Sequence, residues 1–442
     1  INEQQGSLTF NDLCNQIELI ALNLSKLDLR DTNSIGIIGN RSSKSISLMS
    51  ALQYLHIPYT FLDDKNSKER LEYILYDSEI KYIINCYDNL NDLPDINNDY
   101  VIINYSSLVN QTLDKIEDLN VRRLPKFSQL IYTSGSTGKP KGIELTFENI
   151  LSLSFNNGFY EVKEDDNFAQ ASSMAFDASI FEIWVPLLNG ASVTIIPEPV
   201  IDISNWEKQI KDKGITTAWL TSGLFNTFSD LNISVFESLN SFFVGGEIIS
   251  PKHVLNAMNQ CEKTTFYNGY GPTENTTFTT VYKIPRNIDA NTAIPIGRLL
   301  NNSTARVVDE LGNVLPIGVP GELVVSGTGI ANGYHNSNSK NSFSYVENFG
   351  NCYSTGDIVV FDGDNFHFVE RKDSQVKIRG FRVELSEIEQ TIEQIPNVER
   401  AVVICTSSLN GIKELVAFYI GTIEKEELRK VLRKKLPSYM LP

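Results

Sequence analysis

Short apolar segments rich in β-branched residues alternate with helical patterns through the first two thirds of this chain. Residues 34–40, 81–85 and 241–245 fit buried strands, and residues 43–55 fit a helix that follows the first of them. Strands that alternate with helices are typical of βαβ units, which build parallel sheets. The alternation therefore predicts an α/β fold, and the 442 residues allow about three units of domain size at roughly 150 residues each.

The pattern changes near residue 295, where turns such as residues 362–365 separate short apolar strands. These turns predict antiparallel hairpins in a small β-barrel-like subdomain over about residues 295–371. After Asp373, the pattern of residues 372–442 predicts a compact α+β unit. We therefore expect an N-terminal core over residues 1–371, with two α/β sheet subdomains and the β subdomain, followed by a small C-terminal subdomain.

Three expected helices begin with recognisable capping residues. Ser204, with Glu207 three positions later, predicts a capping box at the start of a helix over residues 203–214. Ser250 before Pro251 predicts an N-cap followed by proline at the first helical position. Ser386 is expected to cap a helix in the C-terminal subdomain.

Composition excludes several classes of protein. The 54 acidic side chains exceed the 38 basic ones, and no long basic run occurs outside residues 429–435, which argues against a nucleic-acid-binding face. The five cysteines are scattered without a CxxC pair, which favours a reduced compartment. The N-terminal residues form no signal peptide, and no stretch of about 18 apolar residues occurs. We expect a cytoplasmic protein that binds neither nucleic acid nor membranes.

The most concentrated chemical pattern is residues 132–142, with the sequence Tyr-Thr-Ser-Gly-Ser-Thr-Gly-Lys-Pro-Lys-Gly, directly after an apolar strand. The glycines let backbone N–H groups turn toward a ligand, and the hydroxyls and two lysines add donors and charge. Only two residues separate Gly135 from Gly138, so the segment is not a Walker A loop. It predicts a polyphosphate-binding loop, against the alternative of a flexible surface loop.

This segment resembles the phosphate-binding signature of the adenylate-forming superfamily, and more specifically that of the amino-acid adenylation domains of nonribosomal peptide synthetases. Further family-like motifs follow in order at residues 268–274, 321–334, 353–357, 371–384 and 436–442. The resemblance implies ATP and Mg²⁺ as cofactors, an α-amino acid as substrate, and aminoacyl-AMP as product. It also implies a carrier-protein phosphopantetheine thiol as acceptor, with carrier and other synthetase domains in the same longer chain making a secondary metabolite.

The resemblance also implies roles for single residues. Thr133, Lys141 and Glu274 would be catalytic, and the Glu274 carboxylate would hold Mg²⁺, a hard cation that prefers oxygen ligands. Tyr270 would stack on adenine and Asp357 would accept the ribose hydroxyls, although singly these residues would suggest core packing and a turn. The residues expected to contact the nucleotide are Thr133, Ser134, Gly135, Ser136, Thr137, Gly138, Lys139, Asn268, Gly269, Tyr270, Gly271, Thr273, Asp357 and Arg371.

Asp177 lies in an otherwise apolar stretch, residues 175–185, where a carboxylate is costly unless it meets a cation. The resemblance implies that it pairs with the substrate α-ammonium, and a helix N-cap is the alternative. The implied pocket consists of Asp177, Ala178, Phe181, Trp219, Phe243, Gly245, Gly269, Thr277 and Phe278. Aromatic walls with one polar threonine fit a branched aliphatic side chain, so we expect valine ahead of isoleucine and leucine, with relaxed selectivity.

The resemblance implies that Asp373 is the hinge about which the C-terminal subdomain swings between two half-reactions. The family's catalytic lysine comes a few residues after the Leu-Pro-x-Tyr-Met run, and this sequence stops at Pro442. We therefore expect a truncated subdomain, with binding of ATP and amino acid but weak adenylation. The alternatives are an acyl- or aryl-CoA ligase on the same scaffold, in which Asp177 has no ammonium to bind, and a non-catalytic fragment that binds ATP and amino acid.

Overall fold

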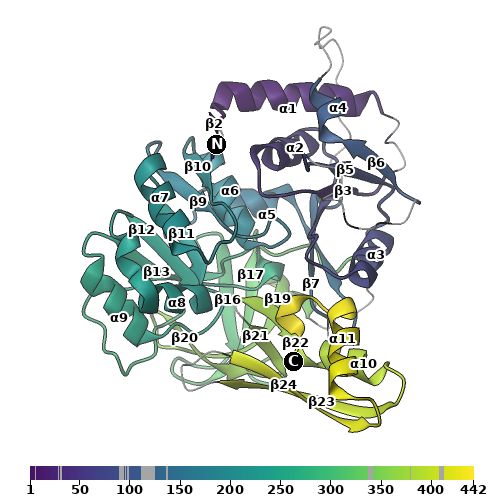
Figure 1. The fold of residues 1–442 in the computed structure, drawn as a ribbon. Helices are drawn as coiled ribbons and strands as arrows, with labels where there is room; N and C mark the ends of the chain where they lie inside the picture. The colour runs from purple at the N-terminus through teal and green to yellow at the C-terminus, as the bar shows by residue number, and fades with distance from the viewer. Residues whose placement is uncertain are drawn as a thin grey trace.

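The chain forms an N-terminal body of two helix-covered sheets, with a β subdomain and a C-terminal subdomain packed beside it (Figure 1). The computed structural model describes residues 1–4, 6–27, 29, 32–88, 94, 96, 99–110, 125–135, 138–336, 342–378, 380–407 and 413–442. Among these residues, no helix is long and apolar enough to cross a membrane.

The largest sheet in the described residues is parallel at its centre, as the alternation of strands and helices predicts. Its strands, in spatial order, are β15 (Arg298–Leu299), β14 (Thr280–Lys283), β13 (Thr265–Tyr270), β12 (Ser241–Gly245), β11 (Thr217–Thr221), β9 (Asn167–Gln170), β10 (Ser192–Ile195), β1 (Asn2–Glu3) and β2 (Gly6–Ser7). The helical elements after these strands are α6 (Ala178–Leu188), α7 (Ile203–Lys213), α8 (Ser222–Asn232), η2 (Ile233–Phe236), α9 (Pro251–Gln260) and η3 (Thr273–Asn275).

A second sheet occupies the N-terminal part of the body. Its strands, in spatial order, are β6 (Val101–Asn104), β5 (Tyr82–Asn85), β3 (Ile35–Ile38), β4 (Tyr59–Leu62), β7 (Gln129–Thr133) and β8 (Lys141–Leu145). Its helices are α1 (Phe10–Ser25), α2 (Ser43–Tyr54), α3 (Lys68–Asp77), α4 (Tyr105–Val109) and α5 (Phe147–Ser154). Helices α5 and α6 pack together, and one buried apolar cluster extends through both sheets. The two sheets therefore share one hydrophobic core.

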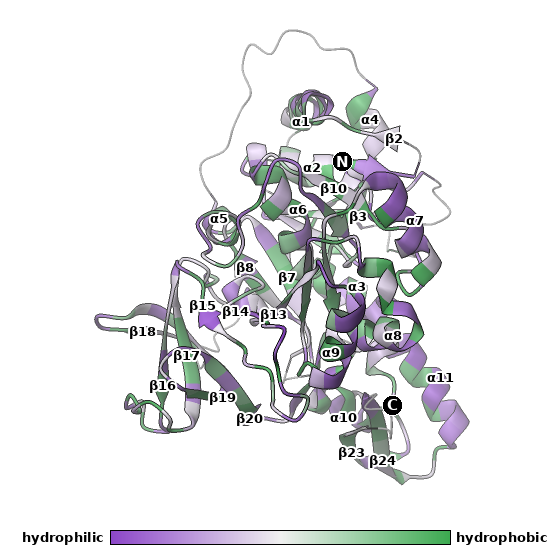
Figure 2. Ribbon diagram, turned by 90° about the vertical axis from the view of Figure 1, so that its left-hand side faces the viewer, coloured by the Kyte–Doolittle hydropathy of each residue, from purple (hydrophilic) through white to green (hydrophobic). Residues whose placement is uncertain are grey.

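The β subdomain is an antiparallel sheet, as the turns after residue 295 predict. Its strands are β16 (Ser303–Val308), β17 (Gly321–Gly327), β18 (Phe343–Val346), β19 (Gly350–Phe361) and β20 (Phe366–Arg371). The C-terminal elements are β21 (Gln375–Ile378), β22 (Phe381–Glu384), α10 (Leu385–Glu393), β23 (Val398–Ser407), β24 (Lys413–Gly421), α11 (Lys425–Lys435) and η4 (Ser438–Met440). They enclose an apolar cluster of their own, and α11 turns a hydrophilic face outward (Figure 2).

Two of the predicted helix caps were wrong. Helix α7 begins after Asp202, whose carboxylate accepts the N–H groups of Ser204 and Asn205, so Ser204 lies inside the first turn. Helix α10 begins after Glu384, which likewise places Ser386 inside the helix. Only Asp202 caps its helix through its side chain, because the carboxylate of Glu384 accepts from Gln375 instead.

The third predicted cap is only partly confirmed. Helix α9 starts at Pro251 after Ser250, as expected. The Ser250 hydroxyl makes no capping hydrogen bond and instead lies 2.7 Å from Nδ1 of His253. The proline defines this helix start, because its fixed φ angle suits the first helical position.

Candidate active site

The predicted functional residues converge where the sheets and subdomains meet. Gly380, between β21 and β22, donates to Glu247 just after β12, Tyr270 at the end of β13 donates to Asp357 of β19, and Ser134 after β7 donates to Arg382 of β22. Ligand sites of open α/β sheets commonly lie at the carboxyl ends of the strands. The N-terminal core and both smaller subdomains therefore contribute to one site.

The phosphate loop connects two antiparallel strands, in which Thr133 of β7 pairs with Lys141 of β8. Gly138 has a φ of +76°, which favours glycine. A Cβ atom on Gly135 would lie 2.0 Å from the carbonyl oxygen of Lys139, so the loop needs glycine there as well. Of the predicted loop residues, Ser136 and Thr137 lie outside the described residues.

The loop contacts the C-terminal subdomain directly. The Ser134 hydroxyl donates to the carbonyl oxygen of Arg382 at 2.7 Å, and the N–H of Gly135 donates to Oε2 of Glu387 at 3.0 Å. The two loop lysines lie over aromatic rings of the core, Lys139 over Tyr73 and Lys141 over Tyr334, each with its Nζ 5.3 Å from the ring centroid.

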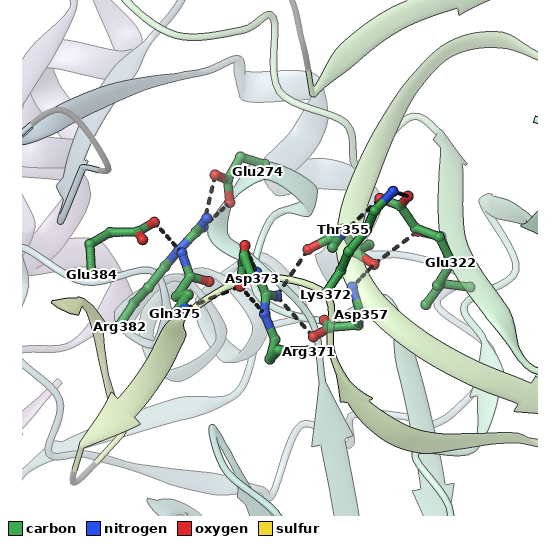
Figure 3. Close-up of polar contacts among 12 residues, drawn as sticks. Glu274, Glu322, Thr355, Asp357, Arg371, Lys372, Asp373, Gln375, Arg382 and Glu384 are labelled. Atoms are coloured by element: carbon green, nitrogen blue, oxygen red, sulfur yellow. Dashed lines mark hydrogen bonds and ion pairs between the residues drawn. The ribbon is translucent and has the colours of Figure 1, made fainter. Parts of the chain in front are cut away.

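Glu274 is completely buried in η3 and both of its carboxylate oxygens accept from Nη1 of Arg382, at 2.8 and 2.6 Å (Figure 3). The Tyr334 hydroxyl donates to the same carboxylate at 2.7 Å. Burial acts to raise the pKa of Glu274, but Arg382 and Tyr334 outweigh it and hold the pKa below the ordinary value. The carboxylate is therefore ionised and has a cation beside it.

Glu274 also fits a Mg²⁺ site. In the described part of the chain, no group of three His, Cys, Asp or Glu side chains could hold a metal ion. Mg²⁺ in nucleotide sites commonly takes one or two protein carboxylates and completes its shell with phosphate oxygens and water. A single buried carboxylate opposite a phosphate loop meets that requirement.

The residues predicted at the ribose lie side by side. Asp357 of β19 and Arg371 of β20 are register partners, and Nη1 of Arg371 donates to Oδ1 of Asp357 at 2.8 Å. The Tyr270 hydroxyl donates to the other oxygen of Asp357. Arg371 also makes two hydrogen bonds to Asp373, at 2.9 and 2.6 Å (Figure 3). The predicted hinge residue is thus tied to the predicted ribose residues.

The glycines of the adenine motif are required by close packing. A Cβ on Gly269 would lie 2.5 Å from the ring of Phe278, and one on Gly271 would lie 2.5 Å from the carbonyl oxygen of Thr277. Asn268, within β13, donates through Nδ2 to the carbonyl oxygen of Pro295 at 2.8 Å. The motif is therefore held against the segment that leads into the β subdomain.

Asp177 occupies the N-cap position of α6 but makes no side-chain capping bond. Its carboxylate accepts from the Thr273 hydroxyl at 2.7 Å, and its carbonyl oxygen accepts from the Thr277 hydroxyl at 2.7 Å. Desolvation raises the pKa of Asp177, and the hydrogen bond from Thr273 and the charge of Lys377 partly oppose this. The pKa stays above its ordinary value, so the buried carboxylate has less stabilising charge around it than it would need to offset its desolvation.

The predicted pocket aromatics contact one another beside Asp177. The ring centroid of Phe181 lies 4.9 Å from that of Phe243 and 5.1 Å from that of Phe278. Trp219 of β11 and Phe243 of β12 are register partners. Gly245, two residues further along β12, is the register partner of Gly269 on β13. Ala178 is buried at the start of α6.

Sequence reasoning missed a second layer behind this pocket. Tyr267 stacks on Phe243 with 4.5 Å between centroids, and Phe159 meets both Phe243 and Phe278 edge-on at 6.0 and 6.1 Å. Phe159 follows α5 in a segment without any motif, so no sequence signal connects it to the pocket. Arg382 and Glu387 were also missed as site residues, although the first lies within the recognised motif at residues 371–384.

The chain belongs to the AMP-binding enzyme family, because residues 1–335 match the family model of that description. The resemblance to the adenylate-forming superfamily is thereby confirmed. Over 444 aligned residues, covering 99% of this chain, it is 35% identical to gramicidin S synthase 2 of Brevibacillus brevis. It is 36% identical to tyrocidine synthase 3 of Brevibacillus parabrevis over 98% of its length. The chain spans only 10% and 7% of these two relatives.

Solved structures agree with this assignment and with the predicted fold class. A holo NRPS protein that contains adenylation and PCP domains, bound to a vinylsulfonamide inhibitor, superposes with a TM-score of 0.89 at 27% identity. The match covers 100% of this chain and 76% of that one. An artificially fused adenylation-PCP di-domain NRPS from Klebsiella oxytoca gives a TM-score of 0.90 at 25% identity, over 100% of this chain and 89% of that one.

Proposed function

We propose that this chain is an amino-acid adenylation domain of a nonribosomal peptide synthetase, which activates a branched aliphatic amino acid with ATP. The observation that carries the proposal is the position of Asp177, a desolvated carboxylate beside the aromatic rings predicted to line the substrate pocket. A substrate α-ammonium paired with this carboxylate would offset the free-energy cost of the hydration that the carboxylate loses on burial. The similarity to gramicidin S and tyrocidine synthases supports the same reading.

The site has the parts needed to join a carboxylate to the α-phosphate of ATP. Asp357 and Tyr270, which we propose for the ribose and the adenine, are hydrogen-bonded to each other, and the loop from Thr133 to Lys141 would supply amides, hydroxyls and lysines to the phosphates. Bound at Glu274, Mg²⁺ would neutralise charge on the phosphoryl oxygens. The protein's task is to orient the amino acid carboxylate for in-line attack, since such transfers depend mainly on positioning.

Valine is the substrate that best fits the pocket chemistry. Apart from Asp177, the predicted lining offers one side-chain hydroxyl, on Thr277, and this hydroxyl already donates to a carbonyl oxygen. Trp219 adds one buried N–H donor without a partner, but a charged side chain would find no counter-ion in the lining and an amide would keep unpaired donors of its own. One methylene changes binding by about 1–3 kcal/mol, so isoleucine and leucine are expected to follow valine.

The aminoacyl group would then pass to the phosphopantetheine thiol of a carrier domain. Two of the structural relatives contain adenylation and PCP domains, and the curated relatives are far longer than this chain. The carrier would belong to the same synthetase. We place the protein in the cytoplasm because its five cysteines are free and scattered, as is usual in a reducing compartment.

Equilibrium binding tests the proposal in this chain. Sulfamoyl-adenosine analogues, in which a stable sulfamate replaces the phosphate, are titrated by calorimetry with valine, leucine, phenylalanine, glutamate and 2-hydroxyisovalerate as the acyl group. The valine analogue is expected to bind most tightly. Asp177→Asn should weaken it by about 100-fold, because a charge loses its buried partner, and should leave the hydroxy analogue unchanged.

Asp165→Asn is the matched control, because Asp165 is exposed on the loop before β9. Tightest binding of the glutamate analogue would contradict the pocket assignment. Tightest binding of the hydroxy analogue, with no effect of the Asp177 variant, would favour an acyl-CoA ligase instead. Valine-dependent exchange of pyrophosphate into ATP then tests the reaction itself.

A further inference from the structure

The segment that contains Tyr334 and His335 extends the edge of the N-terminal sheet beside the phosphate loop. Strand β8 stands at one end of the strand order of that sheet, and Ile143 within it forms an antiparallel bridge with Tyr334. The N–H of His335 donates to the carbonyl oxygen of Gly142 at 2.7 Å. Successive side chains of an extended segment point to opposite sides, so Tyr334 and His335 contact different parts of the core.

Tyr334 contacts two residues of the candidate active site. Its hydroxyl donates to Oε1 of Glu274 at 2.7 Å, and Nζ of Lys141 lies 5.3 Å from the centroid of its ring. Burial and the charge of Glu274 raise the pKa of Tyr334, so the hydroxyl stays protonated and remains a donor. One side chain therefore touches both the carboxylate proposed for Mg²⁺ and a lysine of the phosphate loop.

His335 belongs to a buried ionic cluster. Its Nδ1 lies 2.9 Å from Oε1 of Glu144, a carboxylate whose other oxygen lies 2.8 Å from Nζ of Lys126. The side chains of Glu144 and His335 are 2% and 11% exposed. Burial acts to raise the pKa of Glu144, but His335 and Lys126 outweigh it and hold the pKa below the ordinary value. The carboxylate is therefore ionised, and Nδ1 of His335 donates to it.

Further contacts fix the backbone on either side of Tyr334. Asn332 donates through Nδ2 to the carbonyl oxygen of Lys126. The ring of His335 packs edge-on against that of Phe127, with 5.3 Å between centroids. The position of the Tyr334 hydroxyl is therefore set by contacts that lie outside the candidate active site.

We propose that Tyr334 is a positioning residue for the carboxylate of Glu274, and that the pairing of His335 with Glu144 keeps Tyr334 in place. The inference rests on the proposed function, because it takes Glu274 as the ligand of Mg²⁺. A hydrogen bond to a metal-binding carboxylate fixes its orientation, and loss of such a partner typically costs about 10- to 100-fold in metal affinity. Tyr334 and Glu274 both belong to the N-terminal core, so this contact does not depend on the C-terminal subdomain.

Nucleotide binding with and without metal tests the inference in the full 442-residue chain. ATP is titrated by calorimetry in excess Mg²⁺ and again in EDTA, and the ratio of the two dissociation constants gives the metal-dependent gain in affinity. Tyr334→Phe is expected to lower this gain about tenfold. It should leave the dissociation constant in EDTA unchanged, because the ring stays beside Lys141.

A double-mutant cycle tests the role of His335. His335→Leu should lower the same gain about 3- to 10-fold, although its side chain contacts Glu144 rather than Glu274. In a Tyr334→Phe background this loss should disappear, because a residue that acts only through the Tyr334 hydroxyl has no effect once the hydroxyl is gone. His335→Asn should recover most of the gain, since its side-chain amide can donate to Glu144 in place of Nδ1.

Two variants control for general effects of these substitutions. Tyr345→Phe removes a hydroxyl from β18 at a position that is 74% exposed. His367→Leu breaks another contact between a histidine and a carboxylate, with Asp362 at 2.6 Å. Both should leave the two dissociation constants unchanged. Thermal unfolding is recorded for every variant, and if His335→Leu does not fold, the cycle is run with Glu144→Gln, which weakens the same pairing.

Three results would overturn the inference. An unchanged metal-dependent gain in Tyr334→Phe would mean that Glu274 is oriented without this hydroxyl. Weaker binding of ATP by that variant in EDTA would mean that Tyr334 contacts the nucleotide itself. Additive effects in the cycle would mean that His335 acts independently of Tyr334. The proposed function fails in a different way, because a wild-type chain that binds ATP no more tightly with Mg²⁺ would overturn the metal site itself and this inference with it.

Discussion

Phe159 lies behind the proposed amino-acid pocket, because its ring meets those of Phe243 and Phe278 at 6.0 and 6.1 Å. Phe159→Leu is expected to let these two rings retreat and enlarge the pocket. The ratio of leucine-analogue to valine-analogue affinity should then rise about tenfold, since one methylene is worth about 1–3 kcal/mol in such a pocket. The measurement is calorimetric titration of the two sulfamoyl-adenosine analogues.

Phe155→Leu provides the comparison for that variant, because Phe155 lies in the same segment and is 42% exposed. It should leave the ratio unchanged. An unchanged ratio in a properly folded Phe159→Leu protein would mean that the two pocket rings are held by other contacts, such as the stacking of Phe243 on Tyr267.

Helix α6 is anchored by a buried carboxylate. Glu182, one turn after the pocket residues, accepts from the N–H and hydroxyl of Ser172 at 2.9 and 3.0 Å and from the N–H of Ala171 at 3.2 Å. Desolvation raises the pKa of Glu182 to about 7, against 4.5 for an ordinary glutamate. The segment that leads to Asp177 is therefore held by a group that titrates near neutrality.

Stability should fall with rising pH through this group. A raised folded-state pKa contributes stability that is complete below the unfolded value and is lost as the pH rises through the folded value. The loss between pH 4.5 and 7 amounts to about 3 kcal/mol at ~1.4 kcal/mol per pKa unit. Glu182→Gln should flatten this slope in urea unfolding between those pH values, whereas Glu161→Gln, on the exposed surface, should keep it.

Burial determined which elements could be predicted from the sequence. The strand expected at residues 241–245 coincides with β12, because apolar residues buried on both faces leave a strong pattern. Within residues 372–442, whose pattern predicts only an α+β unit, β21 and β22 pair around Gly380, which has a φ of +84°. The chain reverses there because the N–H of Gly380 donates to Glu247 in the core, a contact that local sequence cannot reveal.

Site residues could be predicted where they belong to a sequence motif, and could not where their contact depends on how two subdomains pack. Asp357 and Arg371 could be assigned together because each belongs to a motif, and the structure makes them register partners. The contact between Arg382 and Glu274 depends on how two subdomains dock. Nothing in the spacing of residues along the chain encodes that docking.

The docked arrangement of the two parts of the chain is held largely by charge. Besides the pairs Arg371–Asp373 and Lys372–Glu322 at the junction itself, four ion pairs connect the core to the C-terminal subdomain, among the residues that the structure describes. They are Arg70–Glu387, Arg382–Glu274, Lys413–Glu247 and Lys435–Glu69. The last two are partly exposed, with the Glu69 side chain 58% exposed. Salt should weaken these two pairs more than the buried ones, because solvent screens exposed charges most strongly.

The double variant Lys413→Gln with Lys435→Gln should therefore loosen docking without touching the candidate site. Exposed pairs contribute about 0.2–1 kcal/mol each, so the open population should rise about 2- to 30-fold, read as faster hydrogen exchange of residues 381–388, which cover β22 and the first turn of α10. Raising NaCl from about 0.05 to about 0.5 M should speed exchange more in the wild type than in the double variant. The control is Lys430→Gln with Lys434→Gln, which removes the same charge from exposed positions on α11 and should behave as wild type. Equal effects of the two double variants would show that net charge, rather than these ion pairs, controls docking.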